Sequence, residues 1–273
     1  MTGEGLLADL ATATEIAAAA ASEALAWFHR DVEWVEKSSA TDLVSDADRA
    51  VEQLIVGRLH DAFAADDVVG EEGTDVDGTA RDGARCWYVD PIDGTTNFLK
   101  RLPLWGISMG LADADDTLLA GVVVLPVTGE VFTAARGHGA WRNGVPIRCS
   151  DVDRLDRTLI TYALAGDRGS WGPAIAQGAL ALAATALGTR MQGCSVADLT
   201  SVAMGRIDAT IGGGMSKWDV AAGLLIAAEA GVRITTPDGA PSTGPDDAFV
   251  ASPPAVHDAI RAVLADAGAL PGG

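Results

Sequence analysis

The chain is poor in cysteine, in aromatic residues and in basic residues. It has 3 cysteines among 273 residues, 5% aromatic residues, and 19 Lys+Arg against 38 Asp+Glu. Three scattered cysteines are too few for a disulfide framework or a zinc knuckle, so we expect reduced thiols and a cytoplasmic protein. The formal net charge of −19 repels phosphate backbones and anionic lipid headgroups. We therefore expect neither a nucleic-acid polymer nor a membrane as a partner.

Long apolar runs are also absent from the sequence. No stretch of 18 or more apolar residues occurs, so we predict no membrane-spanning helix. The apolar stretch at 17–21 follows Asp9 and Glu15 instead of a basic segment, unlike a secretory signal peptide. With 48% hydrophobic residues, a chain of 273 residues can bury a large core, which excludes intrinsic disorder.

The first half predicts helices followed by strands. Ala, Leu and Glu recur at helical spacing over 6–28, a short strand fits 34–37, and a second helix is expected from Ser45 to about 64. Apolar strands are expected at 68–69 and 87–89. Asp-rich or Pro/Gly turns then separate the segments of an antiparallel meander, at 104–112, 118–126 and 129–135.

The second half predicts alternating strands and helices. We expect two halves, 1–150 and 151–273, that share an interface and form one compact unit. The strands are expected at 158–163, 207–211, 232–235 and 248–251, and the helices at 171–187, 195–204, 218–230 and 254–267.

The segment 90–98 is the most informative part of the sequence. Asp90 and Asp93 stand three residues apart around a proline turn, so their carboxylates can converge on a hard divalent cation. The backbone carbonyl of Ile92 between them is a natural further ligand. Gly94 and the threonines after it can open a helix whose N–H groups face an anion, and glycine lets that anion approach the backbone. The segment therefore predicts neighbouring metal and phosphate sites.

Two other acids can reach the same cation. Glu71 follows the apolar strand at 68–69, and a carboxylate at a strand end can bind an ion; taken alone, it fits a solvated loop acid better. Asp219 stands at the start of a strongly apolar helix, where it could instead complement the helix dipole.

Other catalytic motifs fit less well. A G-x-S-x-G sequence at 106–110 is typical of serine hydrolases only when its serine lies on a sharp turn into a helix, whereas 104–112 predicts a continuous strand. The histidines have no zinc-binding spacing and are interpreted as surface or helix-end residues: His29, His60, His138 and His257.

Taken together, these motifs resemble the inositol monophosphatase family. The resemblance rests on 70–72, on 90–98, and on Trp218-Asp219 followed by 228–231, in the order and spacing of the family. It extends over nearly the whole chain, and the further matching segments are Lys37-Ser38-Ser39, 42–44, 46–48, 137–141 and 143–144.

This resemblance implies an α+β (α/β) layered fold, the α-β-α-β-α sandwich of inositol monophosphatases and sugar phosphatases, and Mg²⁺-dependent hydrolysis of phosphate monoesters. It implies two to three Mg²⁺ ions. Glu71, Asp90 and the Ile92 carbonyl would hold one ion, Asp90, Asp93 and Asp219 a second, and a third, weaker ion could lie near Glu71.

The resemblance also assigns roles around the phosphate. Thr95 would orient the attacking water, with Asp48 in the shell around it, and the amides of Gly94 and Thr95 would hold the phosphate. One ion would activate the water and another would stabilise the leaving alkoxide. The family resemblance further suggests a homodimer and sensitivity to Li⁺.

The chain departs from the family at the positions expected to bind the substrate. Members that cleave inositol phosphate usually have an acid at the position of Gly212, which argues against a tight polyol fit and suggests room for a bulkier leaving group. Cys194, after Gly193, replaces the usual Ser or Thr. Lys217 could contact a second anionic group or be a solvated lysine, and Asp198 is expected to be available for a hydroxyl or amine.

The sequence therefore predicts a phosphatase for a small phosphorylated metabolite, an alcohol phosphate with a nucleoside-like or amino-sugar-like group. Inositol 1-phosphate and histidinol phosphate are the alternative substrates. The alternative from another class is a regulatory binding protein with the same fold. The complete set of ion-binding acids favours the enzyme, since a protein that only binds a partner has no need of it.

Overall fold

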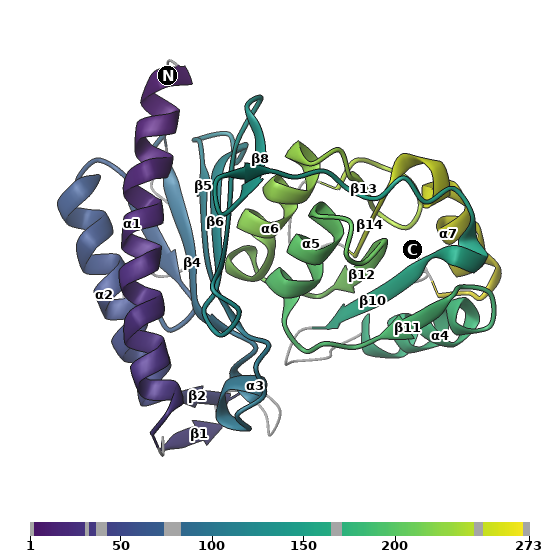
Figure 1. Ribbon diagram of the computed structural model, residues 1–273, viewed down its shortest axis with the longest axis horizontal. Helices are drawn as coiled ribbons and strands as arrows, with labels where there is room; N and C mark the ends of the chain where they lie inside the picture. The colour runs from purple at the N-terminus through teal and green to yellow at the C-terminus, as the bar shows by residue number, and fades with distance from the viewer. Residues whose placement is uncertain are drawn as a thin grey trace.

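The fold is an alternation of helical layers and sheets, shown as a ribbon in Figure 1. The structure is a computed structural model that describes residues 3–30, 33–36, 43–73, 83–164, 171–242 and 248–269. Helices α1 and α2 cover one face of a seven-stranded sheet, and α5 and α6 lie between that sheet and a five-stranded sheet. Helices α4 and α7 cover the far side. The predicted α-β-α-β-α sandwich is confirmed.

The outer helical layer begins the chain. Helix α1 (Gly3–Phe28) is rich in alanine, the best helix former, and it buries residues at helical spacing. A short hairpin of β1 (Trp34–Glu36) and β2 (Leu43–Ser45) leads into α2 (Asp46–Ala62). Ser45 caps α2 in a reciprocal capping box with Asp48, which fixes the start of the helix.

The seven-stranded sheet has its strands in the order β3-β4-β5-β6-β7-β8-β9. Strand β3 is parallel to β4, and all other neighbours are antiparallel. The strands are β3 (Asp67–Gly70), β4 (Cys86–Asp93), β5 (Gly106–Ala112), β6 (Leu118–Leu125), β7 (Glu130–Ala135), β8 (Gly139–Arg142) and β9 (Val145–Pro146), and the short helix α3 (Thr95–Leu99) follows β4.

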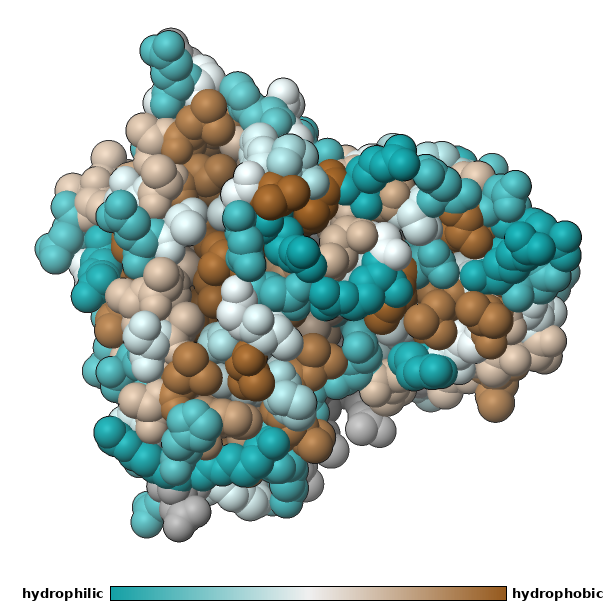
Figure 2. Space-filling model, in the orientation of Figure 1, coloured by the Kyte–Doolittle hydropathy of each residue, from teal (hydrophilic) through white to brown (hydrophobic). Residues whose placement is uncertain are grey.

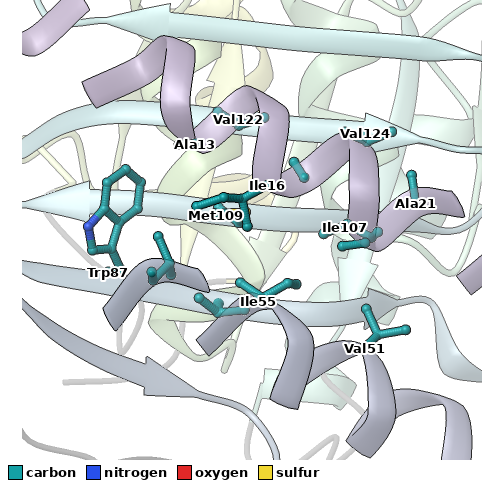
Figure 3. Packing of buried hydrophobic residues seen from close by; sticks show 14 of the residues in the cluster. Ala13, Ile16, Ala21, Val51, Ile55, Trp87, Ile107, Met109, Val122 and Val124 are labelled. Atoms are coloured by element: carbon teal, nitrogen blue, oxygen red, sulfur yellow. The ribbon is translucent and has the colours of Figure 1, made fainter. Parts of the chain in front are cut away.

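The main core lies between this sheet and the first two helices. Figure 3 shows side chains of α1 and α2, Ile16 and Ile55 among them, facing Trp87, Met109 and Val122 of the sheet. All three sheet residues are fully buried. Burying such a side chain contributes roughly 1.5–3 kcal/mol, so this cluster holds the strand that carries the 90–93 motif in place.

The middle layer consists of α5 (Ser195–Ala203) and α6 (Lys217–Glu229). Helix α6 lies directly on the backbone of the seven-stranded sheet, because a Cβ built on Gly110 would be 2.8 Å from the Cβ of Ala221. The other end of β5 meets α5, since a Cβ on Gly106 would be 2.8 Å from Val196 Cγ2. Small residues thus let both helices approach the strand next to β4.

The five-stranded sheet has the order β11-β10-β12-β14-β13 and mixes parallel with antiparallel pairs. The face opposite α5 is covered by α4 and α7 (Figure 1). Its elements are η1 (Leu155–Arg157), β10 (Leu159–Leu164), α4 (Trp171–Ala183), β11 (Gly188–Arg190), β12 (Ala209–Gly213), β13 (Arg233–Thr235), β14 (Phe249–Ser252) and α7 (Pro254–Asp266).

Several local predictions differ from the structure. Strand β4 extends through the predicted turn at Asp90–Asp93, and strands β2, β8, β9 and β11 were not expected. His257 was predicted as a surface or helix-end residue; it lies in the first turn of α7, but it is fully buried between Ser252 (2.8 Å) and Thr235 (2.9 Å). Burial lowers the pKa of His257 to about 4, so its ring is neutral and serves as an internal hydrogen-bond link.

Other predictions agree with the structure. Ser108, the serine of the G-x-S-x-G sequence, is fully buried inside the uninterrupted β5, which rules out a nucleophile elbow there. The three cysteines are free thiols. Within the described ranges, no helix is both long and apolar enough to cross a bilayer. Hydrophilic side chains are spread over the face drawn in Figure 2, as expected if most of the acids form a solvated surface.

The division near residue 150 corresponds to a change of sheet. All strands of the seven-stranded sheet precede it and all strands of the five-stranded sheet follow it. Helices α5 and α6 come from the second half but pack on the first, with buried side chains that reach both sheets.

Candidate active site

The 90–93 segment lies at the end of β4. Strand β4 is bulged here: Asp90 pairs with Ser108, and the register shifts before Asp93 pairs with Gly106. The Ile92 amide donates to Asp90 Oδ1 at 2.9 Å, and the carboxyl groups of Asp90 and Asp93 are both buried. The bulge therefore brings two carboxylates into the interior beside α5 and α6.

The electrostatics of these acids are unusual. Burial raises the pKa of Asp90 well above its usual range, and the charges of Glu71, Asp93 and Asp219 raise it further. Asp90 also shares a hydrogen bond with Glu71. Burial raises the pKa of Asp93 to about 6, against hydrogen bonds from Val196 and Cys194 that lower it. Glu71, Asp93 and Asp219 thus lie near enough to Asp90 for their charges to raise its pKa, which is the placement that the structure gives to the four predicted metal ligands.

A residue that the sequence analysis missed contacts both neighbours of Glu71 in the chain. Glu52 of α2 is fully buried, and its Oε2 accepts a hydrogen bond from the Glu72 amide at 2.8 Å. A Cβ on Gly70 would be 2.4 Å from the same oxygen, so any larger residue there would displace the Glu52 carboxylate. The available signal was the four-residue spacing from Asp48, which places both acids on one face of α2.

Asp48 and Thr95 meet beside the acid cluster. The Ser45 amide donates to Asp48 Oδ2 at 2.8 Å, and Thr95 Oγ1 lies 3.5 Å from Asp48 Oδ1. The Thr95 hydroxyl also lies 3.2 Å from the Ile92 carbonyl oxygen. The hydroxyl predicted to orient a water is therefore held between a buried carboxylate and the backbone carbonyl predicted to bind an ion.

Gly94 connects the predicted phosphate segment with the predicted substrate segment. Its φ of +89° lies in the left-handed region that favours glycine, and a Cβ there would be 3.0 Å from the Gly193 carbonyl oxygen. Asn97 of α3 donates to the carbonyl oxygens of Leu104 (2.6 Å) and Gln192 (2.8 Å). Asn97 was part of the matched motif but had no predicted role; here it ties α3 to the 192–193 loop.

Cys194 faces Asp93, one of the predicted metal ligands. Its thiol lies 3.1 Å from Asp93 Oδ2, and the Val196 amide donates to the same oxygen at 2.6 Å. Burial raises the pKa of the Cys194 thiol well above its usual range, so the group is a neutral donor. Gly193 beside it is exposed. Of this predicted pair, Gly193 faces outward, whereas Cys194 supports Asp93.

The expectation that Asp198 is available to a substrate is corrected. Its side chain is fully buried, and Oδ1 accepts a hydrogen bond from Gln192 Nε2 at 2.5 Å. Burial raises the pKa of Asp198 to about 7. Thr161 lies near enough to lower that pKa, although within the described residues no hydrogen-bond partner of Asp198 Oδ2 is present. Asp198 therefore holds Gln192, and with it the 192–193 loop, through this hydrogen bond.

The expectation of extra room at Gly212 is also corrected. Gly212 pairs with Phe249 of β14, and a Cβ there would be 2.5 Å from the Phe249 ring. Met215 Sδ would be 3.2 Å away. The space that an acidic side chain would need is therefore filled by an apolar ring and a thioether.

Lys217 and Asp219 stand on the first turn of α6. Lys217 Nζ forms an ion pair with Asp116 and lies 3.3 Å from the Tyr88 hydroxyl. Asp219 forms a capping box with Ser216, whose amide donates to Asp219 Oδ2 at 2.7 Å. Lys217 thus has partners within the protein and is only partly exposed, so it is not the fully solvated lysine that was one of the two alternatives. Lys37, from the matched motif, lies outside the described residues.

The acid cluster fits hard divalent cations. In the described part of the chain, no three Asp, Glu, His or Cys side chains form a ready-made metal cage. The oxygens of Asp93 and Asp219 instead accept backbone hydrogen bonds. Carboxylate and carbonyl oxygens are the donors that hard cations such as Mg²⁺ take. A bound cation would also offset the charge repulsion that raises the pKa of Asp90.

Comparisons with known proteins agree with this arrangement. A protein-family model described as "Inositol monophosphatase family" matches residues 7–268. The "Inositol monophosphatase" of Dictyostelium discoideum is 35% identical over 75% of this chain and 76% of its own. The "Nus factor SuhB" of Pseudomonas aeruginosa is 36% identical, with 74% of each chain covered.

A solved structure shares the fold over almost its whole length. The extragenic suppressor protein SuhB of Bartonella henselae aligns with a TM-score of 0.87 at 28% identity, covering 94% of this chain and 98% of that one. The family model spans far more than half of the sequence. The chain therefore belongs to the inositol monophosphatase family and is a phosphoric monoester hydrolase.

Proposed function

We propose that the protein is a Mg²⁺-dependent phosphomonoesterase that hydrolyses a small alcohol phosphate to the alcohol and inorganic phosphate. The observation that carries the proposal is the buried Asp90 carboxyl, whose pKa is raised by burial and then by the charges of Glu71, Asp93 and Asp219. Such a cluster is stable in its ionised form only with cations among its oxygens.

The ion-binding residues follow from the family resemblance and from the placement of the acids. Glu71, Asp90 and the Ile92 carbonyl would hold one Mg²⁺, and Asp90, Asp93 and Asp219 a second. A third, weaker ion would lie near Glu71. When bound, Mg²⁺ would lower the pKa of a water and stabilise the developing charge on the leaving oxygen.

The chain's own groups would orient that water and the phosphate. Thr95 Oγ1 would accept a hydrogen bond from the water and donate one to Asp48 Oδ1, 3.5 Å away. Asp48 would then receive the proton that the water loses. The amides of Gly94 and Thr95, which open α3, would hold the phosphate oxygens, since the first N–H groups of a helix have no partner inside it.

The substrate is proposed from what the site lacks. With Gly212 facing Phe249, no carboxylate at this position can accept hydrogen bonds from ring hydroxyls. This supports a substrate other than inositol 1-phosphate, with a nucleoside-like or amino-sugar-like alcohol. Because Phe249 fills the space at Gly212, the argument from extra room no longer supports such a group. The name of a Synechocystis relative, "Inositol-1-monophosphatase", keeps inositol 1-phosphate as the main alternative.

A phosphate-release assay tests the proposal. Purified protein is titrated with Mg²⁺ against inositol 1-phosphate, histidinol phosphate, 5′-nucleotides and amino-sugar phosphates, with Asp93→Asn as the inactive control. We expect Mg²⁺-dependent turnover of at least one ester. Folded protein with no turnover across the panel would contradict the proposal. It would favour the regulatory binding protein, the class suggested by the name of the Pseudomonas relative.

The proposal includes the cell compartment and the assembly. Free thiols at all three cysteines support a reducing, cytoplasmic environment. A homodimer and inhibition by Li⁺ are proposed from the family resemblance. Sedimentation analysis of the purified chain and the phosphate-release assay with added LiCl test these two points separately.

A further inference from the structure

Lys217 departs from the family, and the proposed reaction does not use it. Its ammonium group forms an ion pair with Asp116 and donates to the Tyr88 hydroxyl at 3.3 Å. It also lies 5.1 Å from the centre of the Tyr88 ring, within the range of a cation–π contact. The three side chains come from α6, from the β5–β6 turn and from β4.

The Tyr88 hydroxyl closes this cluster into a ring of contacts. It donates to Asp116 Oδ1 at 3.1 Å while it accepts from Lys217. Burial raises the pKa of Tyr88, so the hydroxyl keeps its proton and can donate. We call Tyr88, Asp116 and Lys217 the Lys217 clamp. Each member contacts both others, so the loss of one changes the surroundings of the other two.

The turn that carries Asp116 is fixed independently of the clamp. Asp116 has a φ of +63°, in the left-handed region that few residues other than glycine, asparagine and aspartate adopt. Asp113 holds this conformation, because its side chain accepts from the amides of Asp115 (3.0 Å) and Thr117 (2.9 Å). Asp116 is therefore a rigid partner for the lysine.

The clamp joins the two segments that carry acids of the site. Tyr88 lies two residues before Asp90 on β4, so both side chains point to the same face of the sheet. Lys217 lies two residues before Asp219, in the first turn of α6. The body of α6 is fixed by packing on the sheet, whereas its half-buried first turn is held by polar contacts, the Ser216–Asp219 capping box and the ion pair of Lys217.

We propose that the Lys217 clamp is a positioning device that sets Asp219 relative to Asp90 and thereby strengthens Mg²⁺ binding. This inference rests on the proposed function. Lys217 is a positioning residue and does not touch the substrate. The ion pair is partly exposed, with 33% and 45% of the two side chains accessible, so its effect is modest. Losing it should weaken Mg²⁺ binding about three- to fivefold.

The test measures Mg²⁺ binding directly by isothermal titration calorimetry, together with the Mg²⁺-induced rise in melting temperature. Lys217→Met and Asp116→Asn should each raise the Mg²⁺ dissociation constant about three- to fivefold. Asparagine tolerates the left-handed backbone at 116, so that turn should keep its shape. Lys217→Arg should remain close to the wild type, because it keeps the charge.

A matched control removes another cation from an exposed ion pair. Arg154 pairs with Asp156 at 2.6 Å, remote from the acids, and Arg154→Met changes the net charge by the same amount. It should leave Mg²⁺ binding unchanged. The double variant with Met at 217 and Asn at 116 should bind Mg²⁺ no more weakly than the weaker single variant, since both changes break one contact.

Each other outcome overturns the inference. Unchanged Mg²⁺ binding with a raised substrate KM in Lys217→Met would make Lys217 a substrate contact. A lower melting temperature without a change in Mg²⁺ affinity would make the clamp merely structural. If the wild type bound Mg²⁺ and hydrolysed monoesters but the variants behaved normally, only this inference would fail. If the wild type bound no Mg²⁺, the proposed function would fail with it.

Discussion

The two sides of the candidate site are built in different ways. On the acid side, Asp90 and Asp93 share the end of β4, and Glu71 and Asp219 come from two other segments. The charges of the other three acids raise the pKa of the buried Asp90. On the substrate side, the side chains of Cys194, Asp198 and Lys217 are bonded to the protein itself, and Gly212 faces Phe249. The acid side holds unbalanced charge for a ligand to neutralise, whereas most side chains of the substrate side act as supports.

This difference implies that the acid side determines the reaction and that backbone groups and loop positions determine the substrate. Gly193, the exposed member of the substrate side, is placed by Asn97 and by the close approach of Gly94. Gln192 fixes the same loop from the other direction through Asp198. Substrate preference should therefore respond to changes in these supports more than to any single predicted contact.

The largest expected effect is on the acid side. Asp90→Asn should lower kcat on the order of 10³-fold or more, because it removes an oxygen donor shared by both proposed ions. The variant should not melt earlier than the wild type without metal, since a buried charge repelled by three acids is removed. Phosphate release and thermal melting measure the two effects. Near-normal turnover in Mg²⁺ would show that both sides of the site are misassigned.

The proximity of the acids to one another could be anticipated from sequence, because the acids lie in short motifs. The spacing of Asp90 and Asp93 around a proline suffices to suggest convergence, and the start of an apolar helix suggests Asp219. Glu52 was missed because its role depends on contact with Gly70 and Glu72, which the chain reaches only after folding. The order of the elements follows from periodicity, whereas the two-residue β9 has no periodic signal of its own.

The substrate side could not be predicted in the same way. The ring that fills the space at Gly212 belongs to Phe249, far along the chain on a neighbouring strand. The partner of Lys217 is Asp116, on a turn whose position depends on the whole meander. Such long-range pairs are set by tertiary packing. When a residue typical of the family is replaced, as at Gly212, the sequence shows that a contact has changed but not which side chain fills the space.

The next largest effect concerns Asp198 and pH. Its pKa of about 7 in the folded protein exceeds the value of about 3.9 expected in the unfolded chain. Its contribution to stability is thus fully present below about pH 3.9 and is lost as the pH rises through 7. Asp198→Asn should remove this loss and raise the free energy of unfolding at pH 8 on the order of 2–4 kcal/mol.

Denaturant melts of both proteins at pH 4.5 and pH 8 measure this difference, which should shrink strongly at the lower pH. Glu130 provides a contrast, because Arg206 holds the pKa of its carboxyl below the usual range. Glu130→Gln should therefore reduce stability at pH 8. Equal effects of Asp198→Asn at both pH values would show that Asp198 is charged in the fold and open to a ligand, as the sequence first suggested.

A matched pair of glycine substitutions then compares the two sides directly. In Gly70→Ala the new methyl group would lie 2.4 Å from Glu52 Oε2, so the carboxylate must move and release the Glu72 amide. We expect a loss of about 1–3 kcal/mol in stability. Mg²⁺ affinity should fall about tenfold or more, because Glu71 loses its support. Calorimetry with Mg²⁺ and denaturant melts check this; an unchanged Mg²⁺ affinity would separate Glu52 from the acid cluster.

The smallest effect is expected from the other member of the pair, Gly212→Ala. Its methyl group would lie 2.5 Å from the Phe249 ring, so the cost is overpacking of about 1–2 kcal/mol in denaturant melts. Mg²⁺ affinity should stay at the wild-type value, since this contact does not reach the acids. For the same reason Gly212→Glu alone should not create preference for inositol 1-phosphate, whereas the same change combined with Phe249→Ala provides the space. A gain of inositol preference in the single variant would mean that Phe249 yields easily and that position 212 reads the substrate directly.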